Sequence, residues 1–157
     1  MLFWLVSLGA FLLDAISKLL ADRMLQGKSV SLGWLAQFKL AHNPGMALGI
    51  FAKVPAAGIL LPLFAILCGW LMMRCYRITR FTAIACGMVM GGFAGNFVER
   101  ILHGYVLDMI YFPWLPFFVC NVADIFICFG VVLLAYSLLL RPKDWQEKGE
   151  VTKDAHD

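Results

Sequence analysis

Four long apolar stretches, separated by segments that hold most of the charged residues, dominate the pattern along this chain. A helix rises about 1.5 Å per residue, so about twenty apolar residues are enough to cross the hydrocarbon core of a bilayer. Each stretch has roughly that length. The pattern therefore predicts four membrane-spanning helices, over about residues 2–21, 54–73, 81–98 and 119–140.

The segments between these stretches predict the connections of a single domain covering residues 1–157. Two longer connections, 22–53 and 99–118, are expected on one side of the membrane, with a short link, 74–80, and the tail, 141–157, on the other. Within the first connection, Val30 to Leu40 mixes apolar and polar residues in a way that suits short strands.

Composition places the chain among membrane proteins. Apolar residues make up 62%, charged residues make up 15%, and the mean hydropathy is +0.82. Soluble domains are nearer half apolar and a quarter charged. The net charge of +3 is small and scattered, so no nucleic-acid partner is predicted. The five cysteines and three histidines show no metal-ligand spacing, so no metal site is predicted.

The short link 74–80 decides the expected orientation. It carries Arg74, Arg77 and Arg80 without an acidic neighbour, and short loops rich in arginine face the cytoplasm. Four spans place both termini on the same side as this link. The first span has no basic segment before it and is interrupted by Asp14 and Lys18, so we expect it to stay uncleaved.

Asp14 and Lys18 are four residues apart in the first span, so they lie on one face of the helix. An ion pair lowers the cost of placing each charge at membrane depth, and we expect the pair to face protein rather than lipid. Two roles remain open at this point. The pair either positions the helix or takes a direct part in chemistry.

Polar and ionisable groups inside or beside the predicted spans gather toward the outer side of the membrane. A charge in hydrocarbon costs at least a few kcal/mol, and chance placement would spread such groups over both leaflets. Their convergence predicts a functional site at the outer leaflet boundary. The residues are Asp14, Lys18, Asn96, Glu99, Arg100, Asp108 and Asp124.

The two aspartates of the last third of the chain suggest the chemistry. Two carboxyl groups close together in an apolar setting cannot both ionise cheaply, so Asp108 and Asp124 are expected to share one proton. Such a pair suits peptide hydrolysis by an activated water, without a covalent intermediate. The serines and histidines of the chain form no nucleophile–base motif.

The turn His42-Asn43-Pro44-Gly45 leads toward the second span, and Asn-Pro-Gly is turn chemistry. One interpretation is a loop that simply re-enters the second helix. The other is a loop that holds the Asn43 amide toward a bound peptide. The sequence leaves both interpretations open.

Four blocks carry a family resemblance that covers nearly the whole chain. They are LDAISK (Leu13–Lys18), HNPGMALGIF (His42–Phe51), GGFAGNFVERILHGYVLDMIYF (Gly91–Phe112) and FVCNVADIFICFGVVLL (Phe118–Leu134). In this order on four spans, the chain resembles the lipoprotein signal peptidases, or signal peptidase II, a bacterial family of membrane aspartyl proteases.

The resemblance implies that Asp108 and Asp124 are the catalytic dyad. It also implies an all-α membrane fold of four transmembrane helices, with a small extracytoplasmic β-cradle between the first two. Asn121 and Asn43 join the groups that shape the site. Together the implied site-shaping or substrate-binding residues are Asn43, Asn96, Arg100, Asn121, Asp14, Lys18 and Glu99.

The implied substrate is a prolipoprotein whose cysteine already carries diacylglycerol, cut just before that cysteine. Such a substrate reaches the site laterally through membrane lipid. The implied location is the bacterial inner membrane, with both termini cytoplasmic and the active site at the extracytoplasmic leaflet boundary. No cofactor is expected, and we expect a monomer.

Three positions depart from the family pattern. Glu99 stands where the family usually has Asp, and its extra methylene is expected to shift its pairing with Arg100 or a helix neighbour. Tyr111 stands where a second Asp is common, outside the dyad, so activity is expected to survive. The segment NPGMAL after His42 is expected to alter the fit around the substrate.

Two other functional classes compete with a peptidase. A small proton-coupled carrier would use the same carboxylates as a relay, but a relay should reach the inner leaflet, where the predicted spans hold no charge. An assembly subunit would use the glycine-rich third span to pack a partner, which leaves the aspartates without a purpose. The GxGD signature of another intramembrane protease class is absent.

Overall fold

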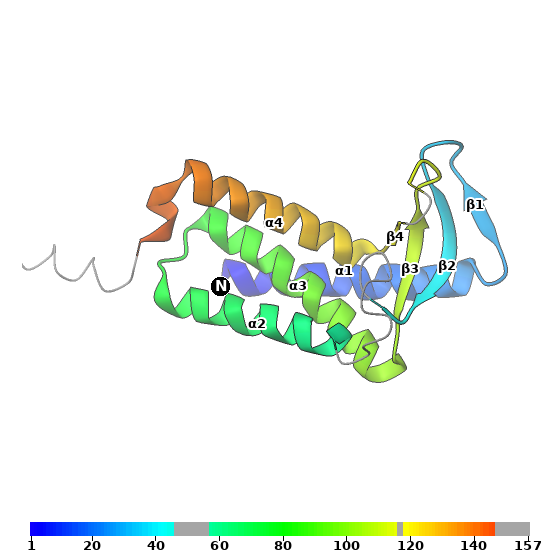
Figure 1. The fold of residues 1–157 in the computed structure, drawn as a ribbon, viewed down its shortest axis with the longest axis horizontal. Coiled ribbons are helices and arrows are strands. Elements are labelled where there is room, and N and C mark those ends of the chain that lie inside the picture. Colours follow the sequence, from blue (N-terminus) through cyan, green and yellow to red (C-terminus); the bar gives the residue numbers. More distant parts are fainter. Residues whose placement is uncertain (46–56, 116–117, 147–157) are drawn as a thin grey trace, which may run out of the picture.

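The computed structural model describes residues 1–45, 57–115 and 118–146, and these form a helical bundle with a small sheet across one end (Figure 1). The helices are α1 (Leu2–Met24), α2 (Ala57–Cys75), α3 (Arg80–His103) and α4 (Val122–Leu140), followed by a short 3₁₀ helix, η2 (Pro142–Trp145). The strands are β1 (Ser29–Ser31), β2 (Gln37–Asn43), β3 (Val106–Tyr111) and β4 (Val119–Cys120).

Within the described residues, α1, α3 and α4 are each long and apolar enough to cross a membrane. Large apolar side chains on these helices stay exposed, among them Leu13 at 57% and Phe129 at 61%, as expected of helices that face lipid. The structure also contains α2, which falls in the second predicted span and continues to Cys75. The following parts of the predictions lie outside the described residues: 46–53 of the first connection, 54–56 of the second span, 116–117 and the tail 147–157.

Helix α3 continues past the predicted end of its span near residue 98. Glu99 and Arg100, which suggested the end of the apolar stretch, both find partners within the fold, so the helix does not need to stop there. It ends at Gly104, which adopts φ 77° and donates its N–H to the carbonyl of Arg100 at 3.0 Å. Glycine accepts this left-handed conformation without strain.

Glycines of α3 allow close contact with two neighbouring helices. A Cβ on Gly91 would lie 2.7 Å from the Cβ of Ala10 on α1. A Cβ on Gly92 would lie 2.6 Å from the carbonyl oxygen of Ala123 on α4. Because no side chain larger than hydrogen fits there, α1 and α4 both pack directly on the backbone of α3.

The sheet is larger than the predicted cradle. Its order is β1-β2-β3-β4, all antiparallel, and β3 and β4 come from the second connection and from the first residues of the predicted fourth span. Val119 and Cys120 pair with β3, so α4 begins only at Val122. The register between β2 and β3 shifts by one residue between Phe38 and Ala41.

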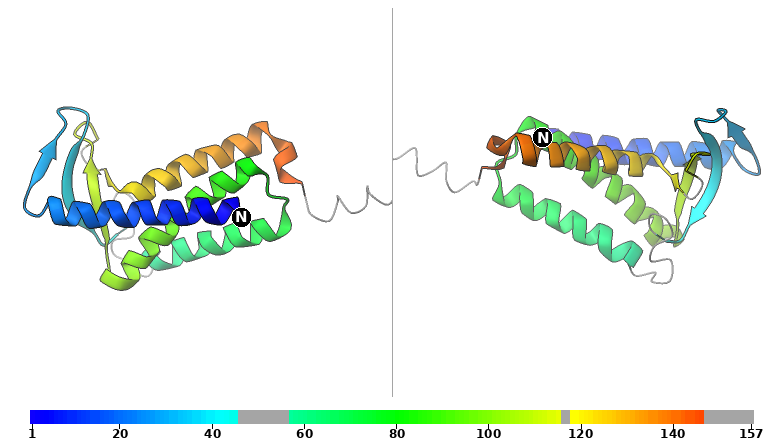
Figure 2. Two further views of the ribbon diagram at one scale, coloured as in Figure 1. Left: turned by 180° about the vertical axis from the view of Figure 1, so that it is seen from behind. Right: turned by 45° about the horizontal axis from the view of Figure 1, so that its top comes forward.

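The sheet lies at the opposite end of the bundle from the N-terminus and η2 (Figures 1 and 2). The link between α2 and α3 is at the N-terminal end too, where the N–H of Arg77 donates to the carbonyl of Gln146 at 2.9 Å. Both ends of the described chain therefore share one end of the bundle, and the sheet covers the other.

Candidate active site

Asp108 and Asp124 line one cavity of about 210 Å³ where the sheet meets the helices. Asp108 projects from β3 and is 2% exposed, while Asp124 lies in the first turn of α4. Four of the seven residues predicted to shape the site line the same cavity as the two aspartates, and apolar side chains complete its wall. The polar residues are Asn43, Asn96, Arg100, Asn121, Asp108 and Asp124.

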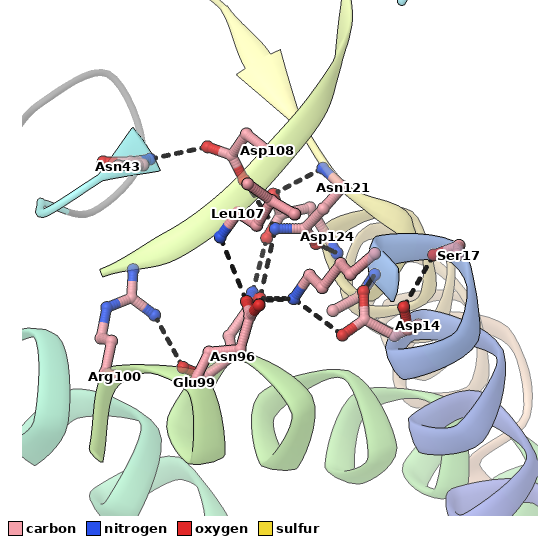
Figure 3. Close-up of polar contacts among 12 residues, drawn as sticks. Asp14, Ser17, Asn43, Asn96, Glu99, Arg100, Leu107, Asp108, Asn121 and Asp124 are labelled. Carbon is pink, nitrogen blue, oxygen red and sulfur yellow. Dashed lines mark hydrogen bonds and ion pairs between the residues drawn. The ribbon is translucent and has the colours of Figure 1, made fainter. Parts of the chain in front are cut away.

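Two amides hold the carboxylate of Asp108. Asn43 Nδ2 donates to Oδ2 at 2.9 Å, and Asn121 Nδ2 donates to Oδ1 at 2.7 Å (Figure 3). Burial raises the pKa of Asp108 to about 6; the hydrogen bond from Asn43 lowers it and the charge of Asp124 raises it. The carboxyl group therefore binds a proton far more readily than an aspartate in water.

Asp124 is held at the N-terminus of α4. Asn96 Nδ2 donates to its Oδ1 at 2.9 Å. The backbone N–H of Asn121 donates to its Oδ2 at 3.3 Å, and the N–H of Asp124 donates to Asn121 Oδ1 at 3.0 Å. This reciprocal pair is a capping box, so Asp124 helps to start the helix on which it stands.

Asn96 and Asn121 join the two carboxylates into one network. Asn121 Nδ2 donates to Asn96 Oδ1 at 3.2 Å as well as to Asp108. A continuous path of hydrogen bonds therefore runs from Asp108 through Asn121 and Asn96 to Asp124. Asn121 is fully buried and Asn96 is 6% exposed, which keeps water from competing for these bonds.

The predicted ion pair of Asp14 and Lys18 is confirmed, with Lys18 Nζ 2.8 Å from Asp14 Oδ2. Asp14 Oδ1 accepts the backbone N–H of Ala123 at 2.8 Å, so this carboxylate also caps α4. Both residues line a second cavity of about 330 Å³ rather than the one that Asp108 and Asp124 share. Of the two roles left open by the sequence, the geometry favours positioning.

Lys18 also contacts Asn96, one of the residues that line the cavity of Asp108 and Asp124. Its Nζ donates to Asn96 Oδ1 at 3.0 Å and lies 2.8 Å from Glu99 Oε2. From the sequence, the extra methylene of Glu99 was expected to shift its pairing with Arg100 or a helix neighbour. In the structure its ion pair is with Lys18, on α1.

Arg100 and Asn43 shape the turn that follows β2. Arg100 Nη2 donates to the carbonyl of Gly45 at 2.7 Å, and Asn43 Oδ1 accepts the N–H of Gly45 at 3.0 Å. Asn43 thus fixes its own turn through its oxygen and reaches Asp108 through its nitrogen. The amide of Asn43 thus faces the candidate site, whereas the path of the loop into the second helix falls on residues 46–56, outside the described residues.

The cavity has an apolar wall that was not predicted from the sequence; it includes Phe93, Val106, Phe118 and Ile127. In a chain this apolar such residues carry no distinguishing signal. The N–H of Leu107 donates to Glu99 Oε2 at 3.2 Å, and residue types do not predict this backbone contact either. In the parts of the chain that the structure describes, no group of three or more His, Cys, Asp or Glu could hold a metal ion.

The fold and the site define a membrane protein in which the carboxyl groups of Asp108 and Asp124 line one cavity, where a small sheet covers one end of a helical bundle. Comparison with known proteins gives the family. The model of the family described as signal peptidase (SPase) II matches residues 6–140, and the chain belongs to this family.

Curated relatives and solved structures agree with this assignment. The lipoprotein signal peptidase of Caldicellulosiruptor bescii is 31% identical over 144 residues, covering 88% of this chain and 91% of the relative. That of Dichelobacter nodosus is 32% identical over 147 residues, covering 88% and 94%. A structure described as a bacterial membrane enzyme, solved by the in meso method, has a TM-score of 0.76 at 23% identity over 92% of this chain and 91% of its own; this likeness concerns the fold.

Proposed function

We propose that this protein is an aspartic endopeptidase that removes the signal peptide from diacylglyceryl-modified prolipoproteins, cutting just before the lipidated cysteine. Membership of the signal peptidase II family supports a peptidase, and the names of the relatives support a prolipoprotein substrate. The single observation that carries the chemistry is that Asp108 and Asp124 line one cavity and are joined through Asn121 and Asn96.

In the proposed reaction the two aspartates share one proton. The raised pKa of Asp108, about 6, makes it a better proton carrier than an ordinary aspartate, while the pKa values seen in kinetics belong to the pair. The ionised carboxylate takes a proton from water, whose oxygen attacks the scissile carbonyl carbon. The protonated carboxyl group hydrogen-bonds the carbonyl oxygen, and a proton then passes to the leaving amine as the C–N bond breaks.

The remaining groups of the cavity are proposed to place the substrate backbone. Arg100 lines the cavity, and its buried Nε has no acceptor among the described residues, which leaves one donor for a peptide carbonyl. Asn43 and Asn121 keep Asp108 oriented while substrate enters. No metal or cofactor takes part in this scheme.

The position of the site suits a substrate that is anchored in the bilayer. The cavity lies at the sheet end of helices that are apolar enough to span a membrane, and its wall includes the apolar side chains of Phe93 and Ile127. A lipid-anchored peptide would approach laterally between the helices. We propose four spans, both termini in the cytoplasm, a monomer in the inner membrane, and a sheet on the extracytoplasmic side.

The test is incubation of the purified full-length protein with a diacylglyceryl-modified prolipoprotein, read as a gel shift of the substrate. Cleavage before the modified cysteine is expected, and intact substrate would overturn the proposal. Asp108→Asn and Asp124→Asn should each abolish cleavage. Asparagine at 124 still offers an oxygen to the N–H of Asn121, so the helix cap and the fold should survive. Robust cleavage by either variant would contradict the dyad.

A further inference from the structure

Glu99 contacts two different parts of the fold through a single carboxylate oxygen. Its Oε2 lies 2.8 Å from Lys18 Nζ on α1 and accepts the backbone N–H of Leu107 on β3 at 3.2 Å (Figure 3). Glu99 itself stands on α3. The side chain therefore ties together two helices and the strand that carries Asp108. It lines the second cavity and not the cavity shared by Asp108 and Asp124.

The contact with Leu107 supplies a hydrogen-bond acceptor for a backbone N–H at the edge of β3. β4 pairs with β3 only at Ile110 and Tyr111, so the edge of β3 near Leu107 extends beyond the end of β4. Leu107 is 6% exposed, which leaves little water to accept its N–H. A buried N–H without an acceptor is costly, and Glu99 supplies the acceptor from the neighbouring helix.

The contact with Lys18 completes the environment of a buried ammonium group. Lys18 is 4% exposed, and an ammonium group has three N–H donors. Three oxygens lie within reach, from Asp14 at 2.8 Å, Glu99 at 2.8 Å and Asn96 at 3.0 Å. Glu99 thus helps to fix Lys18, Lys18 fixes the oxygen of Asn96, and the nitrogen of Asn96 donates to Asp124.

We propose that Glu99 is a positioning residue that fixes the surroundings of both Asp108 and Asp124. This inference rests on the dyad function proposed above. Through Leu107 it fixes β3 beside Asp108, and through Lys18 and Asn96 it fixes the amide that holds Asp124. Its loss should misplace the two carboxyl groups relative to each other and slow the chemical step. Substrate binding should change little, because Glu99 does not line the dyad cavity.

The test compares Glu99→Gln and Glu99→Leu in the full-length protein, with kcat and KM measured on the same prolipoprotein. Glutamine keeps the length and an oxygen for Leu107 but loses the charge that faces Lys18; leucine loses both contacts. We expect the leucine variant to lower kcat by about 10- to 100-fold, with KM within about threefold, and glutamine to lower kcat about threefold to tenfold.

Amide hydrogen exchange in the peptide that contains Leu107 gives a readout that does not depend on cleavage. Exchange there should be faster in the leucine variant and close to wild type in the glutamine variant. Asp124→Asn is the control, since it should abolish cleavage and leave this exchange unchanged. If the wild-type protein cleaves no prolipoprotein, the proposed function fails, and the exchange still decides whether Glu99 holds β3.

Three results would overturn the proposal. They are a wild-type kcat in the leucine variant, a rise in KM with unchanged kcat, and unchanged exchange at Leu107. If the leucine variant does not fold because Lys18 has lost a counter-charge, the glutamine variant decides alone. A wild-type kcat in the glutamine variant would then count against the proposal.

Discussion

Asn121 Nδ2 lies 2.7 Å from Asp108 Oδ1 and joins the first residue before α4 to the middle of β3. The carbonyl oxygen of the same side chain accepts the N–H of Asp124 at 3.0 Å. One fully buried asparagine therefore begins a helix and orients a carboxylate of the strand. These two tasks use different atoms, so substitutions can separate them.

Asn121→Ser and Asn121→Ala form a matched pair for this purpose. Serine is about as good an N-cap as asparagine, whereas alanine loses the cap at a cost of about 1 kcal/mol. Neither can donate to Asp108 and Asn96 from the position of the amide. We expect the serine variant to be more stable than the alanine variant by about that amount. Both should cleave at least about tenfold more slowly than the wild type, as expected when a catalytic group is misplaced.

Thermal unfolding in detergent measures the first difference, and initial rates of prolipoprotein cleavage measure the second. A serine variant with wild-type activity would show that the bond from Asn121 to Asp108 is unimportant. Equal stability of the two variants would show that the cap contributes nothing.

The raised pKa of Asp108 predicts a pH dependence of stability. Burial raises its pKa to about 6 in the folded protein, against about 3.9 in an unfolded chain. Between these values the folded state holds a proton that the unfolded state releases, so stability falls as pH rises from about 4 to about 6. The change attributable to this carboxyl group is at most about 3 kcal/mol.

Asp108→Asn should remove this contribution, because an amide does not titrate in that range. Melting temperatures of the wild type and the variant, measured at intervals between pH 4 and pH 7, test it. The other carboxyl groups are common to both proteins, so the difference between the two curves reports Asp108 together with its coupling to Asp124. Parallel curves would contradict the raised pKa.

Substitutions in the buried cluster around Lys18 should destabilise the protein to different extents. Lys18→Met leaves the carboxylates of Asp14 and Glu99 without their cation, which should destabilise the protein by about 3–5 kcal/mol. Asp14→Asn leaves Lys18 still paired with Glu99 and should cost less. The double variant Asp14→Asn/Lys18→Met should be more stable than Lys18→Met alone.

Unfolding in detergent again supplies the measurement, with correct membrane insertion checked first. A double variant that is less stable than either single variant would mean that Asp14 and Lys18 do not act as a pair.

A side chain at Gly95 should cause a steric clash that a side chain at a glycine with open space around it would not cause. A Cβ at this position would lie 2.5 Å from Asp14 Oδ2, so Gly95→Ala should displace this carboxylate and destabilise the fold by about 1–3 kcal/mol. Gly9→Ala is the control, since a Cβ there would meet nothing within 4 Å. In a helix interior that substitution should stabilise by about 0.5–1 kcal/mol. Similar effects of the two substitutions would argue against a specific role of Gly95.

The sequence pattern located the helices and the polar residues well because both signals are strong in an apolar chain. Asp14 and Lys18 paired as their spacing predicted, since four residues bring two side chains to one face of a helix. Asp108 and Asp124 were singled out because buried carboxyl groups are costly and rare. Such signals need no knowledge of the tertiary fold.

The arrangement of the strands was harder to predict. Val106–Tyr111 is mostly apolar, so its residue types do not distinguish a strand of the sheet from the apolar spans on either side of it. The ion pair of Glu99 with Lys18 was not predicted, because sequence spacing reports neighbours along one helix and not those across the bundle. Such contacts depend on how α1 and β3 are brought beside α3.

The register shift between β2 and β3 determines which side chains of β2 lie on the same face of the sheet as Asp108. Phe38 pairs with Ile110 and Ala41 with Asp108, so three steps along β2 match two along β3. Side chains alternate between the faces of a strand, and Asn43 faces the cavity of Asp108 only because of this extra residue. If the register of Phe38 with Ile110 ran on without this shift, His42 rather than Asn43 would pair with Val106, and its imidazole would lie on the face of the sheet that carries Asp108. The irregular pairing between Phe38 and Ala41 therefore decides which polar side chain of β2 reaches Asp108.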